Sequence, residues 1–224
     1  MIRSRLATLL LAVAIQFPGA LATDALGVTL TQEFRETGEP PATIIEMMFG
    51  SAHMHGGIVA NGACHGDDEP KVSIRLPAGL SVRQALKSIR KVVPGPMTWQ
   101  AHGGAVDVSL IAHRPTILDY RIDVFTWQPG EAISVAVDRL FQTPGVQRRI
   151  TKLGLTPGMT VLFGLQAPPR VGSPPPAPSS PLHLKRVSVF TALNSIELSY
   201  PKSSFWLYEE RNCGQERTYT VGAK

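Results

Sequence analysis

An internal repeat constrains the fold of this chain more than any other feature of its sequence. The segment from Leu80 to Trp99 aligns without a gap on the segment from Val187 to Trp206, 107 residues later. Chance would give about one or two identical pairs in such a window. The aligned segments share eight, namely Ser81/Ser188, Val82/Val189, Ala85/Ala192, Leu86/Leu193, Ser88/Ser195, Ile89/Ile196, Pro94/Pro201 and Trp99/Trp206. The repeat therefore predicts two copies of one small folding unit.

The N-terminus has the order of a secretory signal peptide. Arg3 and Arg5 precede an apolar run over residues 6–15, and small residues follow at Ala20 and Ala22. An apolar run of about ten residues is too short to span a bilayer comfortably. We therefore predict cleavage after Ala22 and a periplasmic or secreted protein with no stable membrane insertion. An uncleaved membrane anchor is the alternative.

The charge balance argues against nucleic acid as a partner. Cleavage after Ala22 would remove two arginines and lower the formal net charge from +5 to +3. The basic residues are spread along the chain, whereas nucleic-acid binding usually needs a clustered basic footprint. We therefore expect protein partners, and the sequence identifies no small-molecule substrate.

Cys64 and Cys213 are the only two cysteines. In an oxidising compartment they could form a disulfide. A disulfide requires the two Cα atoms to lie within about 7 Å of each other, a distance that the sequence does not reveal. Both a disulfide and two separate thiols remain open at this point.

The first half, residues 23–113, has the apolar periodicity of a small α+β unit. Ser81 and Gln84 have the spacing of a capping box at the start of a helix that Pro94 ends. A turn at 102–104 separates two alternating runs, which predicts a hairpin. The expected elements are strands at Val28 and Leu30, 57–59, 72–76, 97–99 and 106–110, and helices at 44–49 and 82–93.

The second half, residues 114–224, repeats this order around a Pro-rich segment at 167–181. That segment holds almost no apolar residues, so we predict an exposed loop insertion. Trp206 occupies the strand position equivalent to Trp99, and both are predicted to anchor the core. The expected elements are strands at 120–125, 182–184, 205–208 and 218–221, and helices at 132–141 and 187–198. The predicted fold is thus two tandem α/β sandwich domains with helices packed on small mixed sheets.

The order of these elements resembles the secretin and TonB short N-terminal domain and its relatives in secretin periplasmic regions. The resemblance rests on the strand at 72–76, the segment Leu80-Ser81-Val82-Arg83-Gln84-Ala85-Leu86, and the strands around Trp99 and at 106–110. Residues 187–193 and 205–208 repeat them. The resemblance implies a small α/β sandwich that contacts other envelope proteins in a transport, secretion or signalling system. Neither a β-barrel nor a secretin channel region follows the two halves, so the partner stays unidentified.

One cluster of residues has the chemistry of metal ligands. His53 and His55 are followed by Cys64 and His65, and imidazole and thiolate donors suit copper or zinc. If His53 and His55 lay on one strand, their side chains would share a face. Polar residues of a loop would look the same, and no second pair of ligands with a closed spacing supports a metal site.

Catalytic motifs are absent from the sequence. It contains no G-x-S-x-G elbow, no phosphate-binding G-x-x-x-x-G-K loop and no G-x-G-x-x-G turn. Adjacent acidic pairs such as Asp67/Asp68 and Glu209/Glu210 are typical of solvated positions. We therefore expect neither an enzyme nor a cofactor.

Two hypotheses of different classes remain. In the first, the chain is a non-enzymatic periplasmic interaction module that offers a sheet edge to an extended segment of another protein. In the second, the chain binds or delivers a metal through His53, His55, Cys64 and His65.

Overall fold

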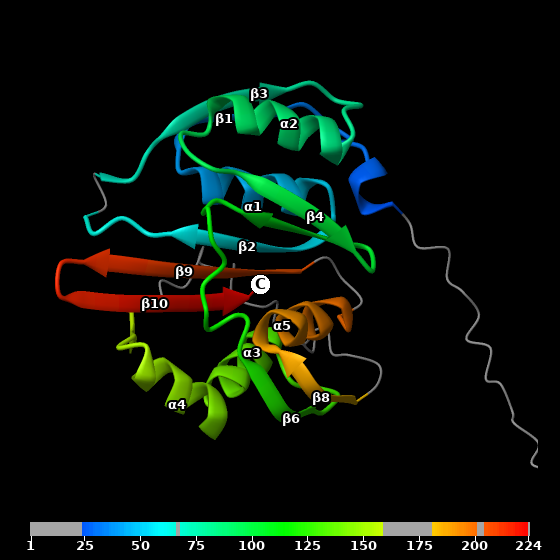
Figure 1. Ribbon diagram of the computed structural model, residues 1–224. Coiled ribbons are helices and arrows are strands. Elements are labelled where there is room, and N and C mark those ends of the chain that lie inside the picture. Colours follow the sequence, from blue (N-terminus) through cyan, green and yellow to red (C-terminus); the bar gives the residue numbers. More distant parts are fainter. Residues whose placement is uncertain (1–23, 66–67, 159–180, 201–203, 224) are drawn as a thin grey trace, which may run out of the picture.

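The computed structural model describes residues 24–65, 68–158, 181–200 and 204–223. These residues form an α+β fold, as the sequence predicts, with helices on both faces of a central sheet (Figure 1). The predicted signal peptide and residues 167–180 of the predicted Pro-rich loop lie outside the described residues. Within the described ranges, no helix is both long enough and apolar enough to cross a membrane.

The first half follows the predicted order closely. The capping box is confirmed: the Gln84 N–H donates to Ser81 Oγ at 3.3 Å, and the Ser81 N–H donates to Gln84 Oε1 at 2.9 Å. The elements are η1 (Ala25–Gly27), β1 (Phe34–Glu39), α1 (Pro41–Ser51), β2 (His55–Asn61), β3 (Val72–Leu76), α2 (Val82–Val92), β4 (Thr98–His102) and β5 (Ala105–Ser109).

The second half repeats this capping at the equivalent serine, since Ser188 Oγ accepts a hydrogen bond from the Thr191 N–H at 3.1 Å. The helix predicted from Val187 begins two residues later, because Val187 and Ser188 end the preceding strand. The elements are β6 (Arg121–Trp127), α3 (Ile133–Phe141), α4 (Pro144–Lys152), β7 (Thr156–Pro157), β8 (Leu182–Ser188), α5 (Val189–Leu198), β9 (Phe205–Cys213) and β10 (Glu216–Ala223).

Two local predictions differ from the structure. The strand expected at Val28 and Leu30 is wrong: this segment makes only a single bridge, from Thr29 to Ser81. The first strand is β1, which the sequence hides because only Phe34 of its residues is buried. Helix α4 was not predicted, since Val146 and Ile150 are its only buried residues.

The strands of the two halves pair in the same way. In the first half, β4 pairs antiparallel with β5, and β5 pairs parallel with β2. In the second half, β9 pairs antiparallel with β10, and β10 pairs parallel with β7. Two smaller antiparallel pairs, β1–β3 and β6–β8, are equivalent as well. The described structure thus extends the repeat well beyond the segment in which the sequence reveals it.

A parallel pairing of β2 with β9 joins the halves into one sheet with the order β4-β5-β2-β9-β10-β7. Six residues of β2, from Gly56 to Asn61, align with Phe205 to Glu210. On one face of this sheet lie α1, α2 and the β1–β3 pair, and on the other lie α3, α4, α5 and the β6–β8 pair (Figure 1). The division into two domains, 23–113 and 114–224, stays a prediction.

Strand β9 contributes to the cores on both faces of the sheet. Phe205 and Leu207 pack in the core of the first half, whereas Trp206 and Tyr208 pack in the core of the second. The predicted core role is confirmed for Trp206, which is fully buried. Trp99, at the equivalent position of β4, is only half-buried and packs at the margin of the first core.

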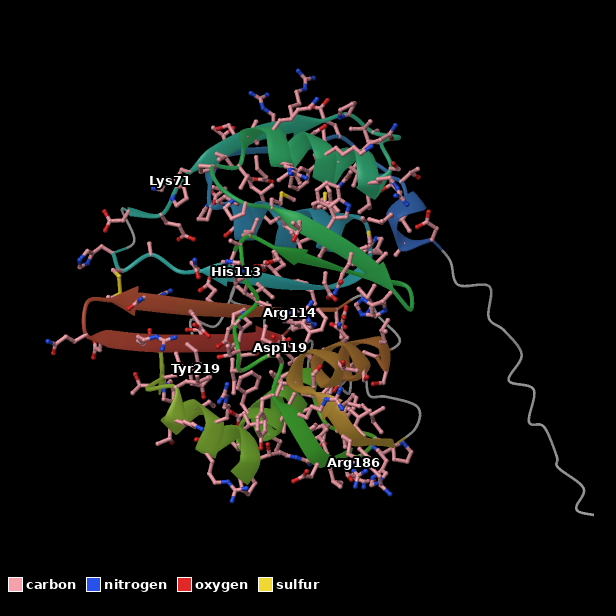
Figure 2. All side chains as sticks on the ribbon, in the orientation of Figure 1. Lys71, His113, Arg114, Asp119, Arg186 and Tyr219 are labelled. Atoms are coloured by element: carbon pink, nitrogen blue, oxygen red, sulfur yellow. A yellow bond between two sulfur atoms is a disulfide. The ribbon has the colours of Figure 1, made fainter. Side chains whose placement is uncertain are left out.

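We call the parallel pairing of β2 with β9 the joint between the halves. A disulfide between Cys64 and Cys213 lies at one end of this joint. The two Cα atoms lie 5.5 Å apart, although the residues are separated by 149 positions in sequence. Cys64 follows β2 and Cys213 ends β9, so the bond links the halves just beyond their paired strands (Figure 2). Of the two possibilities that the sequence left open, the structure has the disulfide.

A substitution at Gly57 offers a test of how closely the two halves approach each other. A Cβ atom at Gly57 would lie 2.2 Å from the Trp206 indole and 2.7 Å from Asp107 Oδ1. We expect Gly57→Ala to lower the free energy of unfolding by about 1–3 kcal/mol, because a buried side chain must shift. Gly50→Ala in α1 is the matched control: its Cβ meets no atom within 4 Å, so we expect a gain of about 0.5–1 kcal/mol. Chemical denaturation measures both, and equal effects of the two variants would contradict the close approach.

The disulfide gives a second prediction. Because the crosslink closes a loop of 149 residues, its loss should lower the free energy of unfolding by about 2–5 kcal/mol. We expect a Cys64→Ser/Cys213→Ser variant to unfold at the same urea concentration as the reduced wild-type protein, and at a lower one than the oxidised protein. An unchanged midpoint in the double variant would show that the bond does not hold the joint.

Candidate functional site

The structure does not assemble the four predicted metal ligands. Cys64 is held in the disulfide, so its thiolate is not available as a ligand in the oxidised protein. His53 precedes β2 with a positive φ of 51° and is exposed, whereas His55 begins β2. Strand β2 then runs for about 20 Å before the chain reaches Cys64 and His65, at about 3.3 Å per residue. Across the described ranges, no group of three or more His, Cys, Asp or Glu side chains is placed to hold a metal ion.

A buried polar cluster lies instead where α5 covers the joint of β2 with β9. We use the name polar cluster for His55, His102, Asp107, Asn194, Glu197, Ser204 and Trp206. Asn194 of α5 is its central residue: its Nδ2 donates to Asp107 Oδ2 at 3.0 Å, and its Oδ1 accepts from Trp206 Nε1 at 2.7 Å. His102 Nδ1 lies 3.1 Å from the same oxygen of Asp107. A single amide thus links strand β5 of the first half to β9 of the second.

The second part of the polar cluster surrounds Glu197, which has no exposed surface. His55 Nδ1 lies 3.4 Å from Glu197 Oε1 and 3.3 Å from Ser204 Oγ. Ser204 in turn donates to the Glu197 backbone carbonyl at 3.3 Å. Among the described residues, neither carboxyl oxygen of Glu197 has a hydrogen-bond partner of good geometry.

Burial controls the charge of the polar cluster. It raises the pKa of Glu197 to about 10, assisted by the nearby Asp107 carboxyl and opposed by the Gly56 N–H. It also raises the pKa of Asp107 to about 7, against hydrogen bonds from Asn194 and Gln100 and the charge of Arg114. Burial lowers the pKa of His55 and of His102. Near neutral pH, Glu197 is therefore protonated and both imidazoles are neutral, as a site of low dielectric constant favours.

Ser204, His55 and Glu197 are the residue types of a nucleophilic triad, but their geometry differs from one. In a triad, the serine contacts one ring nitrogen and the acid contacts the other, so that a proton can pass across the ring. Here both groups contact the same nitrogen, Nδ1 of His55. The burial of Ser204 and Glu197 also keeps substrate away from them. These contacts link α5 and the start of β9 to the start of β2.

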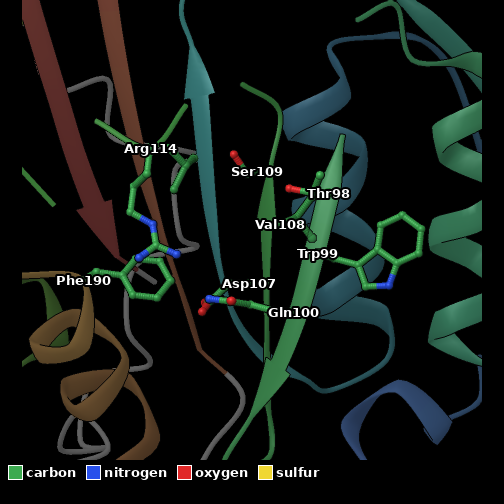
Figure 3. A pocket seen from close by; sticks show the side chains of 9 residues that line it. Thr98, Trp99, Gln100, Asp107, Val108, Ser109, Arg114 and Phe190 are labelled. Atoms are coloured by element: carbon green, nitrogen blue, oxygen red, sulfur yellow. The ribbon is translucent and has the colours of Figure 1, made fainter. Parts of the chain in front are cut away.

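A groove opens beside the polar cluster on the same face of the sheet. Its volume is about 230 Å³, and it lies between β4–β5 and the start of α5. The Arg114 guanidinium stacks 3.9 Å above the ring centre of Phe190 and forms one wall (Figure 3). Gln100 and Asp107 meet on the floor, whereas the Trp99 ring lies on the opposite face of β4 (Figure 3).

Strand β4 forms the outer edge of the sheet next to this groove. In the described part of the chain, no further strand pairs with it. The β4–β5 turn consists of Gly103 and Gly104, both with positive φ. In a two-residue turn of this kind, the flanking residues, here His102 and Ala105, form a hydrogen-bonded pair. Hydrogen-bonded and non-hydrogen-bonded pairs alternate along an antiparallel ladder, so the backbone N–H groups of Trp99 and Ala101 point away from β5. They face outward at an exposed edge.

Sequence reasoning missed both the polar cluster and the groove. Asp107 and Glu197 occupy ordinary polar positions of a strand and a helix, 90 residues apart in the chain. One signal was present: the four residues Phe205-Trp206-Leu207-Tyr208 show no polar alternation, which is typical of a strand buried on both faces. The Thr98-Trp99-Gln100-Ala101 segment of the other copy does alternate.

Comparison with protein-family models, curated proteins and solved structures finds no match to this chain.

Glu197 gives a prediction of pH dependence. Its carboxyl binds a proton in the folded protein up to about pH 10, but it is ionised above about pH 4.5 when unfolded. The folded state therefore binds more protons, so the wild-type protein loses stability as the pH rises through this window. We expect the free energy of unfolding of Glu197→Gln to rise relative to that of the wild type by about 1–2 kcal/mol as the pH goes from about 7.5 to about 9. Burial lowers the pKa of the neighbouring His55 and His102, so these two side chains are already neutral in this range.

The control for this measurement is Glu216→Gln, at an exposed position of β10. It should leave the pH dependence of the wild-type protein unchanged. Parallel stability curves for Glu197→Gln and the wild type would show that Glu197 is already ionised in the folded protein.

Proposed function

We propose that this protein is an exported, non-enzymatic interaction module that captures an extended segment of another envelope protein at the edge of β4. The observation that supports it is the combination at this edge of outward N–H groups on Trp99 and Ala101 with a groove on the adjoining face. Backbone hydrogen bonds would supply affinity, and alternate side chains would supply selectivity.

The equivalence of the two halves supports the proposed relation to secretin and TonB short N-terminal domains. Each half pairs an antiparallel hairpin with a parallel strand, and each carries a second small antiparallel pair. The resemblance implies a small α/β sandwich, and a hairpin, a parallel strand and a second antiparallel pair are compatible with such a unit. We propose a tandem of two such units, acting in the periplasm as an adaptor or accessory of a transport, secretion or signalling system.

The contacts of Ser204, His55 and Glu197 differ from those of a nucleophilic triad, so they add no support for a catalytic function. Ser204 and Glu197 are buried, and His55 contacts both through one nitrogen. The metal-delivery alternative gains no specific observation, since Cys64 is bonded to Cys213.

Ala101 offers a direct test of edge capture. Ala101→Pro removes an outward N–H without removing a bond to β5, whereas Ala101→Thr keeps the N–H and adds a comparable side chain. We expect Ala101→Pro to lower partner capture about tenfold, measured by crosslinking in envelope fractions of the source organism, and Ala101→Thr to retain it. Both variants should unfold at denaturant concentrations close to that of the wild type. Equal capture by the two variants would exclude the β4 edge.

A further inference from the structure

The joint between the halves shows how an edge equivalent to β4 is occupied. Strand β9 corresponds to β4 at a spacing of 107 residues, so Trp206 corresponds to Trp99 and Tyr208 to Ala101. The edge of β9 that faces away from its hairpin partner β10 is filled by β2, which runs parallel to it. The same edge of β4, facing away from β5, is unpaired within the described residues.

The joint also shows what the occupant of such an edge requires on each face. Beside Trp206, the neighbouring residue of β2 is Gly57, and a Cβ there would collide with the indole. Beside Tyr208 it is Val59. These residues lie on the face of the sheet that the helices of the second half cover, and β9 belongs to that half. For β4, the equivalent face carries Trp99 and Ala101.

The opposite faces of β9 and β4 differ in chemistry. In β9 that face carries Phe205 and Leu207, and both are buried in the first core, to which α1 belongs. In β4 the equivalent residues are Thr98 and Gln100, and both are exposed. A second folded copy docked on β4 as the first half docks on β9 would bury these polar side chains against an apolar helix. Their desolvation opposes such docking.

We propose that the edge of β4 takes a single extended peptide segment that runs parallel to β4, with a small residue beside Trp99 and polar side chains on the Thr98 and Gln100 face. This inference rests on the proposed function and adds the orientation, register and side-chain pattern of the partner. The segment comes from a different protein, because a second copy of this chain would bring a helix layer with it. The polar side chains of the segment face solvent at the rim of the groove.

Strand β2 supplies the probe. A synthetic peptide with the sequence of residues 55–61 already has the orientation and the glycine that the joint uses. Changing Ile58→Thr and Ala60→Thr in this peptide places hydroxyls beside Gln100 and His102. The comparison peptides are the unchanged sequence, with Ile58 on the polar face, and the changed sequence written in reverse order, which fits an antiparallel partner.

Binding is measured by amide hydrogen exchange and by tryptophan fluorescence. The exchange of the Trp99 and Ala101 amides should slow, and Trp99 should shift to shorter wavelength, because Trp127 and Trp206 are already fully buried. Trp99→Phe should abolish the fluorescence change without abolishing the slowed exchange at Ala101. We expect the doubly changed peptide to bind the wild-type protein at least about threefold more tightly than either comparison peptide. The Ala101→Pro variant of the protein should lose this binding, and the Ala101→Thr variant should retain it.

Four outcomes would overturn the inference. Tighter binding of the reversed peptide would make the partner antiparallel, and tighter binding of the unchanged peptide would show that the Thr98 and Gln100 face accepts apolar side chains. Protection of the Ala101 amide by concentration-dependent self-association would identify a second copy as the occupant. In each of these cases the crosslinking test with Ala101→Pro still decides the proposed function separately. Failure of all three peptides to slow exchange at Ala101 would overturn the parallel register. If crosslinking to the partner were still lost in Ala101→Pro and kept in Ala101→Thr, the partner would bind the same edge in another orientation or register.

Discussion

Six residues of β2 lie in parallel register beside β9, and this contact makes one sheet of two three-stranded pieces. Each half by itself would leave an edge strand with unpaired backbone groups, which water or another chain must satisfy. The pairing satisfies these groups internally and places Phe205 and Leu207 in one core and Trp206 in the other. The two cores therefore depend on the same strand, and the halves are held together by backbone as well as by side chains.

The register of that pairing is specified by shape and by polar contacts. Trp206 fits only where β2 has a glycine, and its indole N–H donates to Asn194, which in turn holds Asp107. A slip of one residue would move every side chain of β2 to the other face and separate these partners, and a slip towards Ile58 would also bring a side chain against the indole. Burying Glu197 and Asp107 costs stability that the protonation of Glu197 only partly recovers. The polar cluster is best explained as a device that fixes how the halves meet, and the disulfide at the other end of the strands acts on the same contact.

The equivalent strands β4 and β9 differ in the chemistry of one face, and this difference decides which edge lies inside the sheet and which stays unpaired among the described residues. The segment from Phe205 to Glu209 is buried at every residue, whereas β4 has no buried residue. Thr98 and Gln100 stand where Phe205 and Leu207 stand in the other half. Polar residues on an exposed edge discourage pairing with another sheet and tolerate a thin, solvated segment. The proposed capture of a partner segment needs such an edge, because the segment must be able to reach it.

The sequence by itself determined the repeat, most helices and strands, the cap at Ser81, and the hairpin at Gly103 and Gly104. These follow from periodicity and from contacts within a few residues, which are local in the chain. Tertiary structure alone decided that β2 pairs with β9, that Cys64 meets Cys213, and that Asp107 meets Asn194, because each contact joins residues far apart in sequence. The candidate metal ligands are kept apart for the related reason that nearness in sequence is not nearness in space: His55 and Cys64 are near in sequence, but the extended β2 separates them. Extended backbone separates neighbours by about 3.3 Å per residue, and only the pairing of strands brings distant residues together.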